Sequence, residues 1–159
     1  QSAWALDLLQ DQGLLYDSSV FPIYHDLGGF PDSPRYPYQI HDDLWEFPLT
    51  TCRVWRWNVP VGGGGYLRLY PYPVTRWAIR RVNREGIPVM VYVHPWEFDP
   101  TQPRIHGAPL LSRFRHYQNL DKTTERLKSL CSDFEFAPIK TVLAGWIAQH
   151  RRNGRAEDD

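Results

Sequence analysis

The stretch Val-Met-Val-Tyr-Val-His-Pro-Trp-Glu, residues 89–97, carries the strongest strand signal in the chain. It is a short apolar run rich in β-branched and aromatic residues, bounded by Pro88 and Pro95, and this pattern predicts a fully buried strand of a parallel sheet. His94 closes the strand. Ligands meet parallel sheets at the carboxyl ends of their strands, so His94 is either a catalytic acid or base or a histidine that only hydrogen-bonds a neighbouring loop.

The overall composition is that of one soluble globular domain. The chain has 159 residues, of which 42% are hydrophobic and 23% charged, as is ordinary for a domain with a sizeable core. Eighteen basic residues balance eighteen acidic ones, so no overall electrostatic field favours nucleic acid or an anionic membrane. No apolar run approaches the roughly 18 residues of a membrane span, and the first residues do not form a secretion signal. We therefore expect no nucleic-acid partner and no membrane span.

Three further features of the composition bear on function and origin. Aromatic residues make up 14% of the chain, and such residues either line grooves that bind sugars or fill a tryptophan-rich core. Cys52 and Cys131 lie far apart without metal-ligand spacing, which indicates buried free thiols rather than a functional pair. The chain does not begin with Met, and its single Met is Met90, so we expect the true N-terminus to lie upstream.

Hydrophobic periodicity along the chain predicts an alternation of helices and strands, and thus an α/β fold with right-handed crossovers. The expected helices span residues 3–12, 73–86, 122–131 and 139–150, and the expected strands span 14–16, 44–48, 51–57, 66–70, 89–94 and 134–136. Long loops are expected over 21–43 and 98–120. The polar tail from Arg151 to Asp159 is expected to be disordered.

A run of four glycines occupies residues 62–65. Glycine lets the backbone approach a ligand or another chain segment closely, but this run lacks the Lys-Ser/Thr of a P-loop and the spacing of a dinucleotide fingerprint. The run is therefore either a tight turn, which is the interpretation we favour, or a backbone-lined groove.

Ionisable side chains follow several of the expected strands. Asp17 comes after the first strand, and His94, Glu97 and Asp99 come after the central one. An imidazole can protonate a leaving amine or alkoxide near neutral pH, and a carboxylate within hydrogen-bond reach holds the imidazole in place. This pattern favours hydrolytic chemistry with Asp17 paired to His94. Alternatively, residues 17–19 form a local Asx-type turn, and Glu97 and Asp99 are solvated loop charges.

A metal site or a nucleophilic serine has weaker support. Nitrogen and oxygen ligands for a metal are available from His25, Asp26, His41, Asp42 and Asp43. No pair among them has the helical spacing of a zinc signature. No nucleophile elbow occurs either, so a Ser-His-Asp triad has no support beyond proximity in the sequence.

Several segments resemble a known family of hydrolases. They span residues 16–22 (Tyr-Asp-Ser-Ser-Val-Phe-Pro), 60–66 (Pro-Val-Gly-Gly-Gly-Gly-Tyr), 92–100 (Tyr-Val-His-Pro-Trp-Glu-Phe-Asp-Pro) and 111–117 (Leu-Ser-Arg-Phe-Arg-His-Tyr). They resemble the NodB-like polysaccharide deacetylases of the carbohydrate esterase family 4 type, and more closely the subgroup from exopolysaccharide loci that has a distinctive C-terminal region. The resemblance covers nearly the whole chain up to about residue 143.

The resemblance implies a fold, a cofactor and a substrate class. Residues 1–143 would form the C-terminal part of a distorted (β/α) barrel, and residues 144–159 would be a helix end and a polar tail. Enzymes of this family bind a divalent metal, usually zinc, and remove acetyl groups from N-acetylated sugars of a polysaccharide or a lipid-linked glycan.

The resemblance also implies roles for individual residues. His94 matches the histidine of the family's late Leu-x-His motif and would be the general acid that protonates the departing amine. Tyr92 replaces the leucine of that motif and would line the sugar groove, together with Trp96 and Trp45. Asp17 would orient His94, although the tryptophan that usually follows this aspartate is absent. The family's metal ligands and catalytic base lie upstream of this segment, so we expect no metal ligand in this chain.

Together these features predict the C-terminal half of a metal-dependent polysaccharide N-deacetylase, a hydrolase of linear amide C–N bonds. Such an enzyme would act in bacterial exopolysaccharide biosynthesis, in the cytoplasm or at the cell envelope, and the 159-residue chain alone would be inactive. An alternative is a non-catalytic carbohydrate-binding or scaffold module that uses its aromatic groove. A third possibility is a glycoside hydrolase with Glu97 and Asp99 as its paired carboxylates, which would have to splay apart on one loop.

Overall fold

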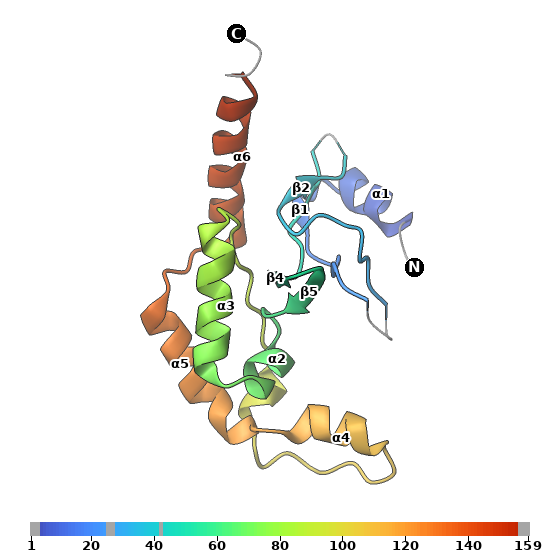
Figure 1. The fold of residues 1–159 in the computed structure, drawn as a ribbon. Helices are drawn as coiled ribbons and strands as arrows, with labels where there is room; N and C mark the ends of the chain where they lie inside the picture. Colours follow the sequence, from blue (N-terminus) through green and yellow to red (C-terminus); the bar gives the residue numbers. More distant parts are fainter. Residues whose placement is uncertain (1–3, 25–27, 42, 156–159) are drawn as a thin grey trace. The chain divides into compact units, whose positions relative to one another are not determined.

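The fold is described by a computed structural model that covers residues 4–24, 28–41 and 43–155 (Figure 1). The chain divides into two compact units. The first unit comprises Gln1–Leu49 and Phe136–Asp159, and the second comprises Thr50–Glu135.

In its described residues, the first unit contains short strands between two helices. The helices are α1 (Trp4–Asp11) and α6 (Ile139–Arg155). β1 (Tyr16–Asp17), β2 (Tyr38–Gln39) and β3 (Trp45–Glu46) form a sheet in the order β1-β3-β2, in which β1 is parallel and β2 antiparallel to β3. The buried apolar residues of this unit are Val20, Ile23, Leu44, Phe47 and Leu143.

The second unit begins with a β-hairpin and continues mainly as helices. β4 (Thr51–Val54) and β5 (Trp57–Pro60) pair in antiparallel fashion. The helical elements that follow are α2 (Gly64–Leu69), α3 (Tyr72–Arg84), the 3-10 helix η1 (Pro95–Phe98), α4 (Leu110–Tyr117), the 3-10 helix η2 (Leu120–Lys122) and α5 (Thr123–Asp133).

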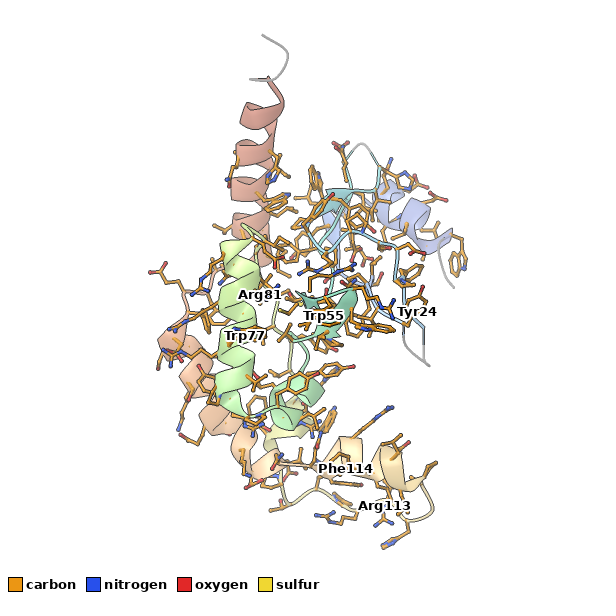
Figure 2. All side chains as sticks on the ribbon, in the orientation of Figure 1. Tyr24, Trp55, Trp77, Arg81, Arg113 and Phe114 are labelled. Atoms are coloured by element: carbon orange, nitrogen blue, oxygen red, sulfur yellow. The ribbon has the colours of Figure 1, made fainter. Side chains whose placement is uncertain are left out.

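Two apolar clusters form the core of the second unit, and α3 contributes to both. The first consists of Cys52, Val61, Ala78 and Val82, and the second consists of Leu67, Ile79 and Leu130. Outside these clusters, α3 carries the exposed residues Trp77 and Arg81, whose guanidinium lies 5.7 Å from the Trp77 ring centroid (Figure 2). The helix predicted from Pro73 to Gly86 is thus confirmed, with one polar and one apolar face.

The stretch Val89–His94 is not the buried parallel strand that its composition predicts. It is extended, but its pairing is an isolated parallel bridge between Tyr92 and Gly63, and its residues are half-buried or exposed. Val89, Val91 and Val93 pack against the second cluster. The alternation of side chains is therefore that of a strand, but a ladder of hydrogen bonds is absent because the segment lies against the start of a helix.

Other elements also differ from their predictions. Residues 66–70 lie in α2 and its C-cap rather than in a strand, because burial of Leu67 and Arg68 overrides the β-propensity of the flanking tyrosines. Residues 134–136 form no ladder, since the segment between α5 and Pro138 has no neighbouring strand to pair with. The loop expected over 98–120 contains α4, which begins directly after Pro109.

The C-terminal helix is longer than predicted. α6 begins after Pro138, as expected, but it continues to Arg155, so residues 151–155 are helical rather than part of a disordered tail. Residues 156–159 of that predicted tail lie outside the described part of the chain.

The mixed α/β character is confirmed, but the predicted barrel is not observed. Among the described residues, the strands form one three-stranded and one two-stranded sheet, and neither closes on itself. Each strand has two to four residues, so most of the packing is between helices and extended segments. A helix both long and apolar enough to cross a bilayer is not found in the described part of the chain.

Candidate active site

The glycine run, residues 62–65, lies against the chain segment that leads to His94. It is not a tight turn, because Gly63 is extended and pairs with Tyr92 in a parallel bridge, and Gly64 begins α2. The backbone N–H of Tyr92 donates to the carbonyl oxygen of Gly62 at 2.9 Å. A methyl group on Gly62 would clash with the carbonyl oxygen of Met90, and one on Gly63 would lie 2.7 Å from the Tyr92 hydroxyl. The glycines therefore permit a close approach of two chain segments.

Replacing Gly62 with alanine should therefore destabilise the second unit. The added methyl group meets backbone rather than a flexible side chain, so we expect the free energy of unfolding to fall by about 2 kcal/mol or more. The matched control is Gly65→Ala, because a methyl group on Gly65 meets nothing within 4 Å and would lie in α2. That substitution should leave stability unchanged or raise it by up to about 1 kcal/mol. Urea unfolding of both variants checks this, and equal losses would contradict it.

The imidazole of His94 is oriented by Glu97. His94 precedes η1, and the two residues form a reciprocal cap in which the Glu97 carboxylate accepts from the His94 backbone N–H at 3.0 Å. The same oxygen lies 2.9 Å from Nδ1 of the imidazole. This contact favours the tautomer with the proton on Nδ1 and leaves Nε2 for another partner. The His94 side chain is 54% exposed, so Nε2 is open to a substrate.

Glu97 itself is a buried charge. Its side chain is only 1% exposed, and its second oxygen accepts from Nε of Arg68 at 2.8 Å in an ion pair whose arginine is also buried. Burial alone would raise the pKa of the Glu97 carboxyl, but the hydrogen bonds from His94 and Arg68 outweigh burial and lower that pKa below its ordinary value. Glu97 is therefore an ionised partner for the imidazole at neutral pH.

Gly64 makes room for this carboxylate. A methyl group at Gly64 would clash with both oxygens of Glu97. The carboxylate therefore packs directly against the start of α2, where only glycine fits.

Arg68 connects the candidate site to the loop after α4. Its Nη1 donates to the carbonyl oxygens of His116 and Gln118, each at 2.9 Å. In return, the backbone carbonyl of Arg68 accepts from the side chains of Asn119 and Arg126. One buried guanidinium thus binds both Glu97 and the end of α4, and these contacts restrict the movement of η1.

Aromatic rings extend from His94 toward α4. The His94 ring stacks on Trp96 with centroids 5.9 Å apart, and Trp96 stacks on His116 at 4.2 Å with an interplanar angle of 5°. The Tyr92 ring meets His94 edge-on at 5.7 Å, and His116 meets Tyr117 edge-on at 4.5 Å. The structure therefore brings Tyr92, His94 and Trp96 together. Because His116 covers part of Trp96, the role of Trp96 as a sugar platform stays a prediction.

The other two predicted site residues belong to the first unit. Asp17 lies in β1 and accepts a hydrogen bond from the hydroxyl of Ser19. Residues 18 and 19 form no turn, so the alternative of an Asx-type turn is wrong. Trp45 lies in β3 and is half-buried. His94 belongs to the second unit, so the pairing of Asp17 with His94 and the place of Trp45 along a sugar groove stay predictions.

A buried carboxyl, Glu46, lies next to Asp17. The two residues are register partners in the parallel pair of β1 and β3, and Glu46 accepts from the backbone N–H of Val20 at 2.9 Å. Burial of the fully inaccessible Glu46 side chain raises its pKa to about 7, the Val20 hydrogen bond opposes this shift, and the nearby Asp17 carboxylate adds to it.

This raised pKa predicts a pH dependence of the first unit. The folded state favours protonated Glu46, so its contribution is fully present below the unfolded pKa of 4.5 and is lost as pH rises through about 7. Stability of the β1–β3 region should fall by about 3 kcal/mol over that window. Hydrogen exchange of peptides from β1 and β3, corrected for intrinsic rates, checks this between pH 5 and pH 8. Glu46→Gln should remove the dependence, and an unchanged slope would assign it to another group.

Comparison with known proteins gives one family. The family model described as a domain of unknown function (DUF3473) matches residues 18–144. The chain belongs to this family. The DUF3473 domain is associated with the C-terminal regions of polysaccharide deacetylases. Neither the curated proteins nor the solved structures include a significant match to the chain. The matched range contains His94, Glu97 and Arg68 and begins just after Asp17.

The described residues of this DUF3473 domain do not form a metal site. Among them, no three His, Cys, Asp or Glu side chains gather so that they could hold an ion. His41 instead forms an ion pair with Asp7, with 3.1 Å between Nε2 and Oδ1. His25, Asp26 and Asp42 lie outside the described residues. The described donors thus do not form a set that fits a divalent metal, and we derive no catalytic step through a metal held by them.

Glu97 and Asp99 have different environments, although one interpretation of the sequence makes both of them solvated loop charges. Glu97 is not a solvated loop charge, whereas Asp99 is exposed and bonds Thr101, as that alternative predicts. The buried ion pair of Glu97 with Arg68 also disfavours a glycosidase with Glu97 and Asp99 as free paired carboxylates. A signal for Glu97 was available, because His-Pro-Trp-Glu has the N-cap to N3 spacing of a capping box.

Proposed function

We propose that this DUF3473 domain is the C-terminal half of a metal-dependent polysaccharide N-deacetylase of the NodB-like class, with His94 as its general acid. The observation that carries the proposal is the hydrogen bond between Nδ1 of His94 and the buried, ionised Glu97. An exposed imidazole held by an ionised carboxylate is a recurrent arrangement for proton transfer. The association of the DUF3473 domain with C-terminal regions of polysaccharide deacetylases and the resemblance of the motif around His94 support the proposal.

The proposed step is protonation of the departing amine. After water has added to the acetamide carbonyl, the C–N bond breaks and its electron pair goes to nitrogen, which takes the proton from Nε2 of His94. Acetate and a free amino sugar result. Glu97 keeps its hydrogen bond to Nδ1 throughout and stabilises the imidazolium before it gives up the proton. Because its pKa is lowered, the Glu97 carboxylate does not take that proton itself.

Arg68 supports this role of Glu97. The guanidinium neutralises the buried carboxylate and fixes its second oxygen at 2.8 Å, so the carboxylate cannot rotate away from the imidazole. In the intact enzyme, the attacking water would be activated by the divalent metal and the base that the resemblance places upstream of this segment.

Acetate release from N-acetylated chitotetraose tests the proposed function. The intact protein with zinc should release acetate, and the 159-residue chain alone with zinc should not. Release by the chain alone would mean that its own residues hold the metal. No release by the intact protein, combined with measurable binding of chitotetraose, would favour a non-catalytic carbohydrate-binding module.

An exposed tryptophan at the β4–β5 turn supports that second candidate. Trp55 is 93% exposed and has a positive φ of 55°, and a flat, solvent-facing indole is a platform on which sugars stack. Under this alternative, Trp55→Ala would abolish chitotetraose binding and His94→Ala would not.

A further inference from the structure

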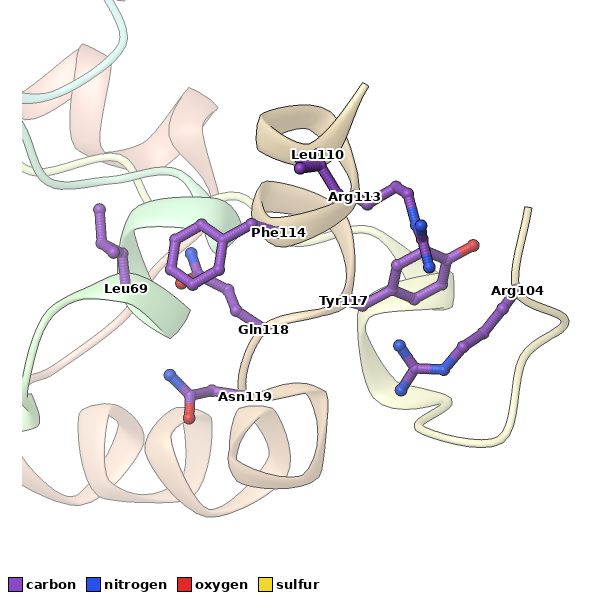
Figure 3. Close-up of a pocket in the computed structure, with 8 residues that line it drawn as sticks. All are labelled: Leu69, Arg104, Leu110, Arg113, Phe114, Tyr117, Gln118 and Asn119. Atoms are coloured by element: carbon purple, nitrogen blue, oxygen red, sulfur yellow. The ribbon is translucent and has the colours of Figure 1, made fainter. Parts of the chain in front are cut away.

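A groove in the second unit lies beside α4, on the far side of the ring stack from His94. Its volume is about 580 Å³. The lining residues come from α2, α4 and the loops around them: Leu69, Arg104, Leu110, Arg113, Phe114, Tyr117, Gln118 and Asn119. Figure 3 shows Phe114 pointing toward Leu69, and Arg104 extending from its loop toward Tyr117.

The groove has a positive charge with no compensating acid. Arg104 and Arg113 line it, and no carboxylate does. Within the described part of the chain, neither guanidinium makes a hydrogen bond or an ion pair. The Arg104 guanidinium lies over the Tyr117 ring, 4.9 Å from its centroid. Two guanidinium groups facing the same open space favour an anionic ligand, because each can form charge-assisted hydrogen bonds to carboxylate or phosphate oxygens.

The loop that carries Arg104 is held in place by α4. The Tyr117 hydroxyl accepts from the backbone N–H of Ile105 at 2.8 Å and donates to the carbonyl of Pro103 at 3.1 Å. Both neighbours of Arg104 are thus bonded to one side chain of the groove wall. This arrangement restricts the position of Arg104 before any ligand arrives, which lowers the entropy cost of binding.

The remaining lining has the mixed character of a sugar site. Phe114 and Leu110 are 56% and 80% exposed and offer apolar faces, and Gln118 offers an amide. Sugar rings combine apolar faces with polar edges, so such a lining suits them better than it suits a purely apolar ligand. The groove is linked to the candidate site by packed rings, since Tyr117 of the groove touches His116 and His116 stacks on Trp96.

We propose that this groove binds an anionic saccharide unit of the substrate, one that carries a carboxylate or a phosphate. The proposal rests on the proposed function, because it takes the groove as a subsite next to the N-acetylated sugar at His94. It assigns the substrate to the acidic glycans or the phosphate-linked ones and gives Arg104 and Arg113 the role of binding the negative charge.

Calorimetric titration of the 159-residue chain tests the proposal with defined probes. The probes are a hyaluronan tetrasaccharide, which carries carboxylates, N-acetylglucosamine 1-phosphate, and neutral chitotetraose. At least one anionic probe should bind about tenfold or more tightly than chitotetraose, and its affinity should fall with added salt. The double variant Arg104→Gln/Arg113→Gln should abolish that preference, whereas Arg113→Lys should keep part of it.

A charge-matched control distinguishes anion binding in the groove from a general effect of the chain's net charge. Arg80→Gln/Arg84→Gln removes the same two charges from the exposed face of α3, outside the groove, and should leave anion binding unchanged. Equal binding of charged and neutral probes, no binding of any probe, or an equal loss with Arg80→Gln/Arg84→Gln would overturn the proposal. Binding of the phosphate probe alone would assign the ligand to phosphate-linked sugars. Because the titration needs no turnover, it can fail while acetate release by the intact protein still stands, and the reverse is also true.

Discussion

His94→Ala is expected to lower kcat for acetate release by the intact deacetylase by about 10²-fold or more, the usual contribution of a general acid. Nδ1 of His94 is held at 2.9 Å from Glu97, and the His94 side chain is 54% exposed, so Nε2 is the nitrogen left for the substrate. Without the imidazole, the amine would have to leave unprotonated, which raises the barrier of the bond-breaking step. Substrate binding depends on other residues, so KM should change much less than kcat. Steady-state acetate release from chitotetraose gives both constants.

His106→Ala is the matched control for this substitution. His106 is an exposed histidine of the same unit and lies in the loop before α4. It should leave kcat and KM unchanged. Near-normal turnover by His94→Ala, or an equal loss in both variants, would remove His94 from the catalytic step.

Glu97→Leu is expected to cost about 3–5 kcal/mol of folding stability, the typical penalty for a buried charge left without its partner. Arg68 is only 2% exposed at its side chain and its Nε would lose the carboxylate 2.8 Å away. Denaturant unfolding of the 159-residue chain measures the loss. Asp99→Asn removes an exposed carboxylate from the same loop and should have a much smaller effect, because the Asp99 carboxylate accepts its hydrogen bonds from Thr101, two residues along the chain.

A double substitution tests the physical reason for this loss. In Glu97→Leu/Arg68→Met, both charges are gone, so a large part of the stability should return even though two residues have changed. A double variant that is less stable than Glu97→Leu alone would show that the backbone hydrogen bonds of Arg68 to His116 and Gln118 matter more than its charge. A loss in Glu97→Leu no larger than that in Asp99→Asn would contradict the buried ion pair itself.

We expect the contacts of Glu97 with His94 and Arg68 to affect the rate of catalysis as well as stability. Glu97→Gln keeps the size of the side chain but replaces the carboxylate with an amide, so the negative charge beside Nδ1 is lost. We expect a lower kcat with a smaller loss of stability than in Glu97→Leu, because the amide oxygen can still accept one hydrogen bond. Parallel kcat and unfolding measurements on the two variants therefore separate orientation of His94 from support of the fold.

Local signals in the sequence predicted several elements correctly. The helix that became α3 has a proline in its first turn and Gly86 after its end, and α6 begins directly after Pro138. The strand predicted over 51–57 is confirmed only as β4, which ends at Val54, because a turn at residues 55–56 begins a hairpin whose second strand, β5, extends beyond the predicted range. These elements depend on contacts within a few residues, so their patterns are visible in one segment at a time.

Non-local contacts explain where prediction from the sequence was wrong. Residues 66–70 have strand-like composition, but burial of Leu67 and Arg68 makes them helical. Residues 89–94 have the alternation of a strand, but the segment they lie against is a glycine run rather than another strand. In both places the partner of the segment, rather than its own residues, determines the secondary structure.

For the candidate site, the sequence by itself determined that His94 follows an apolar segment and resembles a deacetylase acid. Only the tertiary structure decided which carboxylate holds the imidazole. Glu97 reads as a loop charge in the sequence, and it becomes a buried, ionised partner because Arg68, 29 residues away, neutralises it. Burying a charge is costly unless a counter-charge lies beside it and the packing leaves room for both groups. The room for the Glu97 carboxylate comes from the absence of a side chain at Gly64. Neither condition can be read from the residues next to His94.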